Sequence, residues 1–194
     1  MKFLFLITLL IISVFCYSQD CELIEKFKRF HGVEVGKKFP DSLRKYMHPE
    51  YNKVREDTTF YLWENVVSAN QGFKKWLDVG GQFSYMGIST IKSGQVYMLL
   101  LQRSLNGIDS SYLKEGRIPL FYSIVSDELK NLFGNKTKEY IDTGTVATTL
   151  NRDWECDKLK IQLSMSYEGI LNSYSLTIID KILDNKRKFG KYTN

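Results

Sequence analysis

The strongest structural signal in this sequence is an alternation of apolar and polar side chains towards its C-terminal end. The apolar members over residues 158–167 are Leu159, Ile161, Leu163, Met165 and Tyr167. Lysine, glutamine and serine stand between them, and a similar alternation returns over residues 174–178. Because successive side chains of a strand point to opposite faces, the pattern predicts a β-hairpin with one buried and one solvated face.

A second hairpin is predicted earlier in the chain. Residues 82–91 and 95–103 are rich in β-forming side chains, and the short segment Lys92-Ser93-Gly94 between them contains a glycine. Further strands are expected over residues 58–67 and 145–151. The charged residues 50–57 are expected to form a loop.

Three helices are predicted from apolar stripes and end signals. Residues 22–30 place their apolar side chains on one helical face. A short helix over residues 42–47 would have Asp41 as its N-cap. The clearest helix covers residues 118–133, with Gly134 suited to its C-terminal cap.

The order of these elements predicts an α+β domain. Half-buried strands imply an antiparallel sheet, built here from two β-hairpins with helices packed on one face. Residues 19–104 and 105–194 could be two divergent α-β-β halves. A coincidental alternation within a single sheet would give the same pattern.

The N-terminal residues predict export. Lys2 precedes an almost unbroken apolar stretch, residues 3–15, and Ser18-Gln19-Asp20 follows. This is the order of a cleavable signal peptide, and the stretch is shorter than the roughly 20 residues that span a bilayer. We therefore expect residues 1–18 to be removed and residues 19–194 to form one domain in the periplasm or the medium.

Lipid anchoring through Cys16 is the alternative. This cysteine ends the apolar stretch, where a lipid-modified residue would lie. The bulky Phe15 before it replaces the small residue of the bacterial lipoprotein pattern. No second long apolar run follows, so we expect no membrane span after cleavage.

The charge pattern does not indicate a nucleic-acid partner. The net charge is +5, and the only dense basic cluster is Lys186-Arg187-Lys188, followed by Lys191. Nucleic-acid-binding domains usually display a basic face. We interpret this cluster as a solvated C-terminal tail.

Two cysteines, Cys21 and Cys156, would remain after cleavage. Because an exported chain meets an oxidising compartment, we predict a disulfide between them. Closing so long a loop would contribute roughly 4–5 kcal/mol to stability in the chain-entropy model. Two unpaired buried thiols are the alternative.

No pattern of residues indicates catalysis, a metal or a cofactor. The G-x-S-x-G motif of α/β-hydrolases is absent, and His31 and His48 lack metal-ligand spacing. Pairing of Cys156 with a histidine would compete with the disulfide. We predict a non-enzymatic protein, with a hydrolase whose site is not recognisable from sequence as an alternative.

Aromatic residues make up 14% of the chain, and two roles compete for them. Tyrosine and tryptophan are enriched at protein interfaces, but they also pack across strands. We expect most to pack in the sheet and some to face a partner, which would be another protein or an envelope component. The candidates for an interaction surface are Tyr85, Tyr97, Tyr112, Trp63 and Trp154. The sequence does not indicate an oligomeric state.

Two short motifs carry a family resemblance. Gly32-Val33-Glu34-Val35-Gly36 precedes a predicted short helix and a hairpin, and Leu132-Phe133-Gly134 ends the next helix. This order resembles small exported α+β proteins of the β-lactamase-inhibitor-protein type, and it is similar in organisation to the small lipoprotein of outer-membrane β-barrel assembly. The resemblance implies a domain without catalytic groups that offers a sheet surface to another protein.

A second functional hypothesis is an inhibitor or immunity-type protein that acts on an extracytoplasmic enzyme. Small exported domains made rigid by a disulfide suit that role. No binding residue of the resembled families has a counterpart that can be assigned in this sequence.

We predict that the exported protein begins at Gln19, because the small residue Ser18 lies at the expected cleavage position. Intact-mass spectrometry of protein recovered from the envelope or the medium should give the mass of residues 19–194. A mass that retains residues 1–18 would contradict the signal-peptide interpretation.

Overall fold

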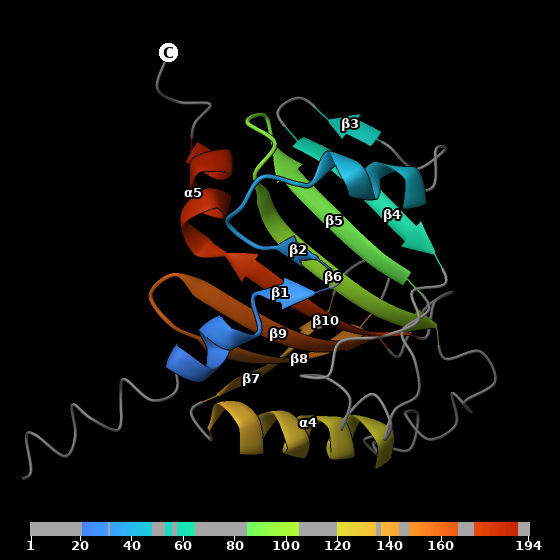
Figure 1. Ribbon diagram of the computed structural model, residues 1–194. Coiled ribbons are helices and arrows are strands. Elements are labelled where there is room, and N and C mark those ends of the chain that lie inside the picture. The colour runs from blue at the N-terminus through green and yellow to red at the C-terminus, as the bar shows by residue number, and fades with distance from the viewer. Residues whose placement is uncertain are drawn as a thin grey trace, which may run out of the picture.

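The structure is a computed structural model that describes most of the chain after residue 20. The described ranges are residues 21–30, 32–47, 53–55, 58–64, 85–104, 120–134, 137–143, 148–166 and 173–189. Within them the chain is α+β with more strand than helix, which confirms the predicted class (Figure 1).

Eight strands form one antiparallel sheet in the order β3-β4-β5-β6-β10-β9-β8-β7 (Figure 1). Their bounds are β3 Lys53–Arg55, β4 Thr58–Glu64, β5 Tyr85–Ile91, β6 Val96–Ser104, β7 Lys138–Thr143, β8 Thr148–Glu155, β9 Leu159–Ser166 and β10 Ser173–Asp180. The sheet therefore consists of two four-stranded meanders that meet where β6 pairs with β10.

The remaining elements are short helices and a small hairpin. They are a helical turn over residues 21–26, β1 Arg29–Phe30, β2 Val33–Glu34, the 3₁₀ helix η1 Asp41–Tyr46, α4 Leu120–Phe133 and α5 Lys181–Phe189. Strands β1 and β2 pair with each other in a separate two-stranded sheet.

The strand register divides the large sheet into two faces. In β9 the buried residues alternate with half-buried Lys160, Gln162, Ser164 and Ser166. Ile161 lies opposite Trp154 of β8 and opposite Ile178 of β10, so the buried side continues across the neighbouring strands. We call the side that carries Ile161 the core face and the other side the back face.

The core lies between the core face and the elements that cover it. Its members outside the sheet include Ile24, Phe30, Val33, Val35, Phe39, Met47, Tyr122, Val125, Leu129 and Phe133. Those on α4 recur at helical spacing, so one side of this helix is buried. Leu99, Leu101, Ile161, Leu163, Leu176 and Ile178 meet them from the sheet, and each is fully buried.

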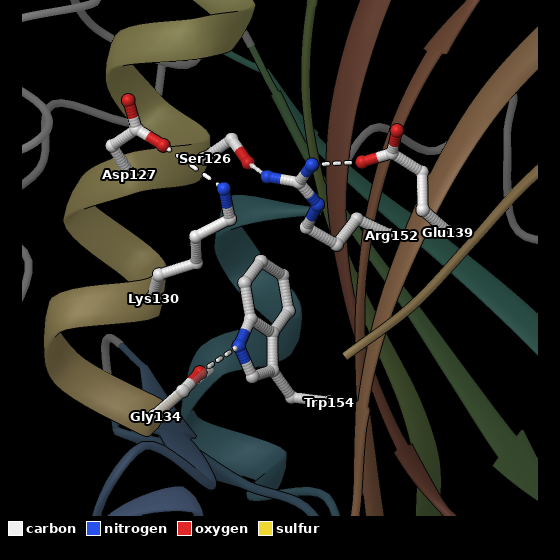
Figure 2. Close-up of polar contacts among 7 residues, drawn as sticks. All are labelled: Ser126, Asp127, Lys130, Gly134, Glu139, Arg152 and Trp154. Atoms are coloured by element: carbon white, nitrogen blue, oxygen red, sulfur yellow. Dashed lines mark hydrogen bonds and ion pairs between the residues drawn. The ribbon is translucent and has the colours of Figure 1, made fainter. Parts of the chain in front are cut away.

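Two side chains of β8 attach α4 to the sheet, as Figure 2 shows. Arg152 donates hydrogen bonds to Ser126 on α4 and to Glu139 on β7. The indole Nε1 of Trp154 donates to the carbonyl oxygen of Gly134, with 3.1 Å between the two atoms. Polar contacts in the middle of the helix and just after its C-terminal end therefore set where it lies on β8.

Both predicted hairpins are confirmed. Strands β5 and β6 pair around the turn that contains Gly94, whose φ is 79°, a value that favours glycine. Strands β9 and β10 pair over the two alternating segments. The predicted helix over residues 118–133 corresponds to α4, and Gly134 after it has φ 90°.

Several local predictions are wrong. The first helix ends at residue 26, because the left-handed Gly32 allows β1 to fold back on β2. Residues 53–55 form strand β3 rather than loop. The N-cap of η1 is Pro40, so Asp41 is already in its first turn.

The basic cluster Lys186-Arg187-Lys188 is helical rather than an unstructured tail, because it forms the last turn of α5, where both lysines are exposed and Arg187 is half-buried. The helix begins after Asp180, whose carboxylate accepts a hydrogen bond from the backbone N–H of Leu183. Arg187 forms an ion pair with Asp184 at 2.8 Å within the helix, and its guanidinium lies over the ring of Tyr97 on β6. Strand β7 was also not predicted from the sequence.

Tyr122 gives a prediction that combines stability with pH. In the described part of the chain its buried hydroxyl has no hydrogen-bond partner, and burial raises its pKa to about 12. The contribution of this protonated phenol to the free energy of unfolding is therefore complete below the unfolded pKa of about 10, and it is lost as the pH rises towards 12. The Tyr122→Phe variant should be as stable as the wild type near neutral pH. Its free energy of unfolding should fall less than that of the wild type as the pH rises, because it has no phenol to ionise.

Urea unfolding of the wild type and Tyr122→Phe at about pH 7 and about pH 11 measures both effects. Tyr46→Phe is the matched control, because Tyr46 is 49% exposed. A clear loss of stability for Tyr122→Phe at neutral pH would mean that its hydroxyl makes a stabilising hydrogen bond in the folded protein.

Candidate interaction surface

The back face is mostly polar on β7 to β10, apart from Ile179 of β10, whereas on β5 and β6 polar residues such as Ser89 and Gln102 lie beside apolar ones. We call its polar side chains on β7 to β10 the polar field. They are Lys138, Tyr140, Asp142, Thr149, Asn151, Asp153, Glu155, Lys160, Gln162, Ser164, Ser166, Ser173, Ser175 and Thr177. On the other side of the β6–β10 pairing, the apolar strip consists of Phe60, Leu62, Met98 and Leu100 on β4 and β6.

Cross-strand hydrogen bonds hold the polar field in place. The amide of Gln162 donates to Tyr140 Oη at 2.7 Å and to Asp153 Oδ1 at 2.9 Å. Two residues further along β9, the Ser164 hydroxyl donates to Asn151 Oδ1, also at 2.7 Å. These side chains are therefore fixed before any partner arrives, which lowers the entropy cost of binding.

A nearly buried ion pair lies at one end of the field. The carboxylate of Asp153 is 5% exposed, and Lys160 Nζ is 2.7 Å from its Oδ2. Burial by itself lowers the pKa of Lys160, but the hydrogen bond and negative charge of Asp153 outweigh it and raise that pKa. The lysine therefore stays charged and neutralises Asp153.

The same environment affects Tyr140, which lies on β7; this strand pairs with β8, the strand that carries Asp153. Burial raises the pKa of the Tyr140 phenol, and the charge of Asp153 raises it further. The phenol therefore stays protonated at neutral pH. The polar field therefore combines neutral hydrogen-bonded side chains, such as Tyr140 and Gln162, with charged ones, and its Asp153–Lys160 ion pair is internally balanced.

The apolar strip depends on a close approach of two strands. Phe60 lies over Gly87, where an added Cβ would stand only 2.8 Å from Phe60 Cε2. Glycine at this position lets the aromatic ring rest on the backbone of β5. Phe60, Leu62, Met98 and Leu100 are all half-buried, so part of each remains accessible to solvent.

The structure does not bring the predicted interaction residues to one surface. Trp154 is 1% exposed and lies under α4, so it is a core residue and not a surface residue. Trp63 is on the core face of β4, half-buried, with its ring stacked on Tyr46 at a centroid distance of 5.2 Å.

The predicted tyrosines are also separated. Tyr85 is half-buried and is on the back face, opposite Gln102. Tyr97 is 8% exposed and lies beneath the guanidinium of Arg187, 5.1 Å from ring centroid to Cζ. Tyr112 lies outside the described residues. Only Tyr85 therefore remains a described candidate for the back face.

Sequence reasoning missed the polar field because it gave most weight to aromatic residues. The signal was present in the polar members of the alternating strands, such as Gln162 and Ser164. Alternation identified these side chains as the solvated side. It did not show that neighbouring strands would join them into one continuous field.

The two cysteines meet, although they are far apart in the sequence. Cys21 in the N-terminal helical turn and the buried Cys156 after β8 are both thiols here, and their side chains are in hydrogen-bond contact. Burial raises the pKa of the Cys21 thiol to about 11, and Cys156 adds to this effect. The contact supports the predicted disulfide, which stays a prediction.

Neither a metal site nor a membrane span is found in the described ranges. No three His, Cys, Asp or Glu side chains there gather closely enough to hold a metal ion. None of the helices there combines the length and apolar character needed to cross a bilayer. His31 and His48 lie outside these ranges.

Comparison with known proteins gives no relative. No protein-family model, no curated protein and no solved structure matches this chain. Its function is therefore inferred from its own residues.

We predict that exported protein contains a Cys21–Cys156 disulfide. Peptide mapping without reductant should recover a cross-linked peptide pair, and alkylation of the denatured protein should label neither cysteine. The free energy of unfolding of the Cys21→Ser variant should be roughly 4–5 kcal/mol lower than that of the oxidised wild type. Quantitative alkylation of both thiols in unreduced wild type would refute the disulfide.

Proposed function

We propose that this protein is an exported, non-enzymatic interaction domain that binds another protein through its back face. The observation that carries the proposal is the joining of the apolar strip to the preorganised polar field on one side of one sheet. The apolar leader over residues 3–15 supports the exported location.

The composition of the back face fits a protein partner. Protein interfaces place apolar side chains at a desolvated centre and polar, hydrogen-bonding side chains around it. Here Phe60, Leu62 and Leu100 would supply the centre, and the polar field would supply the rim on one side. Because the polar field satisfies many of its own hydrogen bonds, docking would leave few buried polar groups without a partner.

The proposal includes an arrangement in which the helices gather on the core face. The contacts of α4 with Arg152 and Trp154 support this, since both residues belong to the core face of β8. The proposal also includes two divergent halves, residues 19–104 and 105–194. Their support is the strand order, in which each half contributes four strands and its last strand lies at the junction.

A matched pair of variants tests the proposal. Leu100→Lys puts a charge on the apolar strip, while the long side chain can still cover its neighbours with its methylene groups. Ile182→Lys on α5 is the control, because Ile182 is already 47% exposed. Circular dichroism and thermal unfolding establish that both variants fold.

We predict that wild type and Ile182→Lys capture the same partner from the native envelope or medium. Leu100→Lys should lose at least nine-tenths of it, because a charge at a desolvated centre is costly. Equal recovery by Leu100→Lys would exclude the back face as the docking surface. Repeated failure of the wild type to capture any partner would remove the interaction function.

A further inference from the structure

Strand β7 ends the sheet with an exposed edge, at the opposite end from β3 (Figure 1). Five of its six residues are exposed, and Tyr140 alone is half-buried. Ile141 is 62% exposed, which is the largest value among the exposed large hydrophobic residues of the described chain. An edge of this kind presents unpaired backbone N–H and C=O groups to any strand that can align with it.

The charges on β7 do not protect this edge in the usual way. Edge strands often avoid association by carrying charges that repel a second copy. Strand β7 carries Lys138 together with Glu139 and Asp142, so both signs are present on one short strand. Lys138 and Asp142 form no ion pair with any residue of the described chain, although Lys138 Nζ lies over the Tyr140 ring.

We propose that β7 pairs antiparallel with β7 of a second copy of this chain, about a two-fold axis that passes between the two Tyr140 residues. This pairing joins two eight-stranded sheets into one continuous sheet. It goes beyond the proposed back-face function, because it uses the edge of the sheet and assigns an oligomeric state.

The register follows from the geometry of the two-fold axis. An axis perpendicular to the sheet keeps both core faces on the same side, so opposed residues must belong to the same face. When Tyr140 is opposite its own copy, Lys138 stands opposite Asp142 of the second copy. The two-fold axis repeats this contact, so Asp142 also stands opposite Lys138 of the second copy. Both residues are on the back face of β7, as the register with β8 shows.

The neighbouring registers are less favourable. If the two-fold axis passes between the two copies of Glu139, two carboxylates stand opposite each other. The same is true if it passes between the two copies of Asp142. If the axis passes between the two copies of Ile141, Lys138 has no residue of β7 opposite it, and Asp142 stands opposite Tyr140. Directly opposed like charges destabilise a strand pair, whereas opposed unlike charges stabilise it. The sequence of β7 therefore complements itself in one register only.

The same register also covers the exposed isoleucines. Ile141 and its copy become diagonal neighbours on the core face, close enough for apolar contact. Each lies opposite Glu139 of the other chain, and Arg152 already holds that glutamate. The edge therefore gains backbone hydrogen bonds, two ion pairs and an apolar contact without breaking an existing interaction.

Charge reversal tests the pairing on the full exported chain. Analytical ultracentrifugation of the wild type over a concentration series should show a monomer–dimer equilibrium. The Lys138→Asp and Asp142→Lys variants should each bind their own copy roughly tenfold or more weakly, because each opposes like charges twice. Lys92→Asp is the matched control, since it makes the same charge change in the exposed β5–β6 turn and should leave the equilibrium unchanged.

Two restorations identify the register. An equimolar mixture of Lys138→Asp and Asp142→Lys should form a heterodimer, because every opposed pair then has unlike charges. The Lys138→Asp/Asp142→Lys double variant should return to the affinity of the wild type. The dimer of the wild type should also weaken with added salt, which is a readout that needs no substitution.

A wild type that stays monomeric at all concentrations overturns the proposal. So does a dimer that is indifferent to the single reversals, and so does failure of both restorations in folded protein. Because Lys138 and Asp142 also belong to the polar field, partner capture is judged by Leu100→Lys and not by the charge reversals; Leu100 lies on β6, four strand positions away from β7. Loss of the dimer and loss of the back-face function are therefore distinguishable.

Discussion

The pairing of β6 with β10 is the constraint on which the rest of the structure depends. It joins two strands that are far apart in the sequence, with Leu101 opposite Leu176 and Leu99 opposite Ile178. These four residues are fully buried, so the junction is also the centre of the core. Without it the chain would hold two separate four-stranded meanders, each with an unpaired edge where its hydrophobic residues are densest.

The junction also determines the character of the back face. The strands on one side of it contribute mostly hydroxyl, amide and charged side chains, and those on the other side contribute Phe60, Leu62, Met98 and Leu100 beside a few polar residues. One continuous surface with an apolar part and a polar part results from joining two meanders of different composition. The cross-strand hydrogen bonds of Gln162 and Ser164 hold the polar part in a defined arrangement, so it can meet a partner without reorganising.

Local patterns were sufficient for some elements and not for others. The two hairpins and α4 could be predicted, because strand alternation and helix end signals act over a few residues. Strand β7 was missed, since its charged side chains follow no apolar alternation and its pairing with β8 is what makes it a strand. The aromatic residues were the least predictable, because Trp154 and Tyr97 are buried against α4 and α5, which are separate segments of the chain.

The sequence by itself determined that the chain is α+β, that its strands have one apolar and one polar side, and where its clearest turns fall. These properties depend on residues that are neighbours along the chain. Only the tertiary structure decided the strand order, the meeting of Cys21 with Cys156, the continuity of the polar field and the exposure of β7 at the end of the sheet. Each of these depends on which distant segments pack together, and that choice is made by the burial of the whole core rather than by any short stretch of residues.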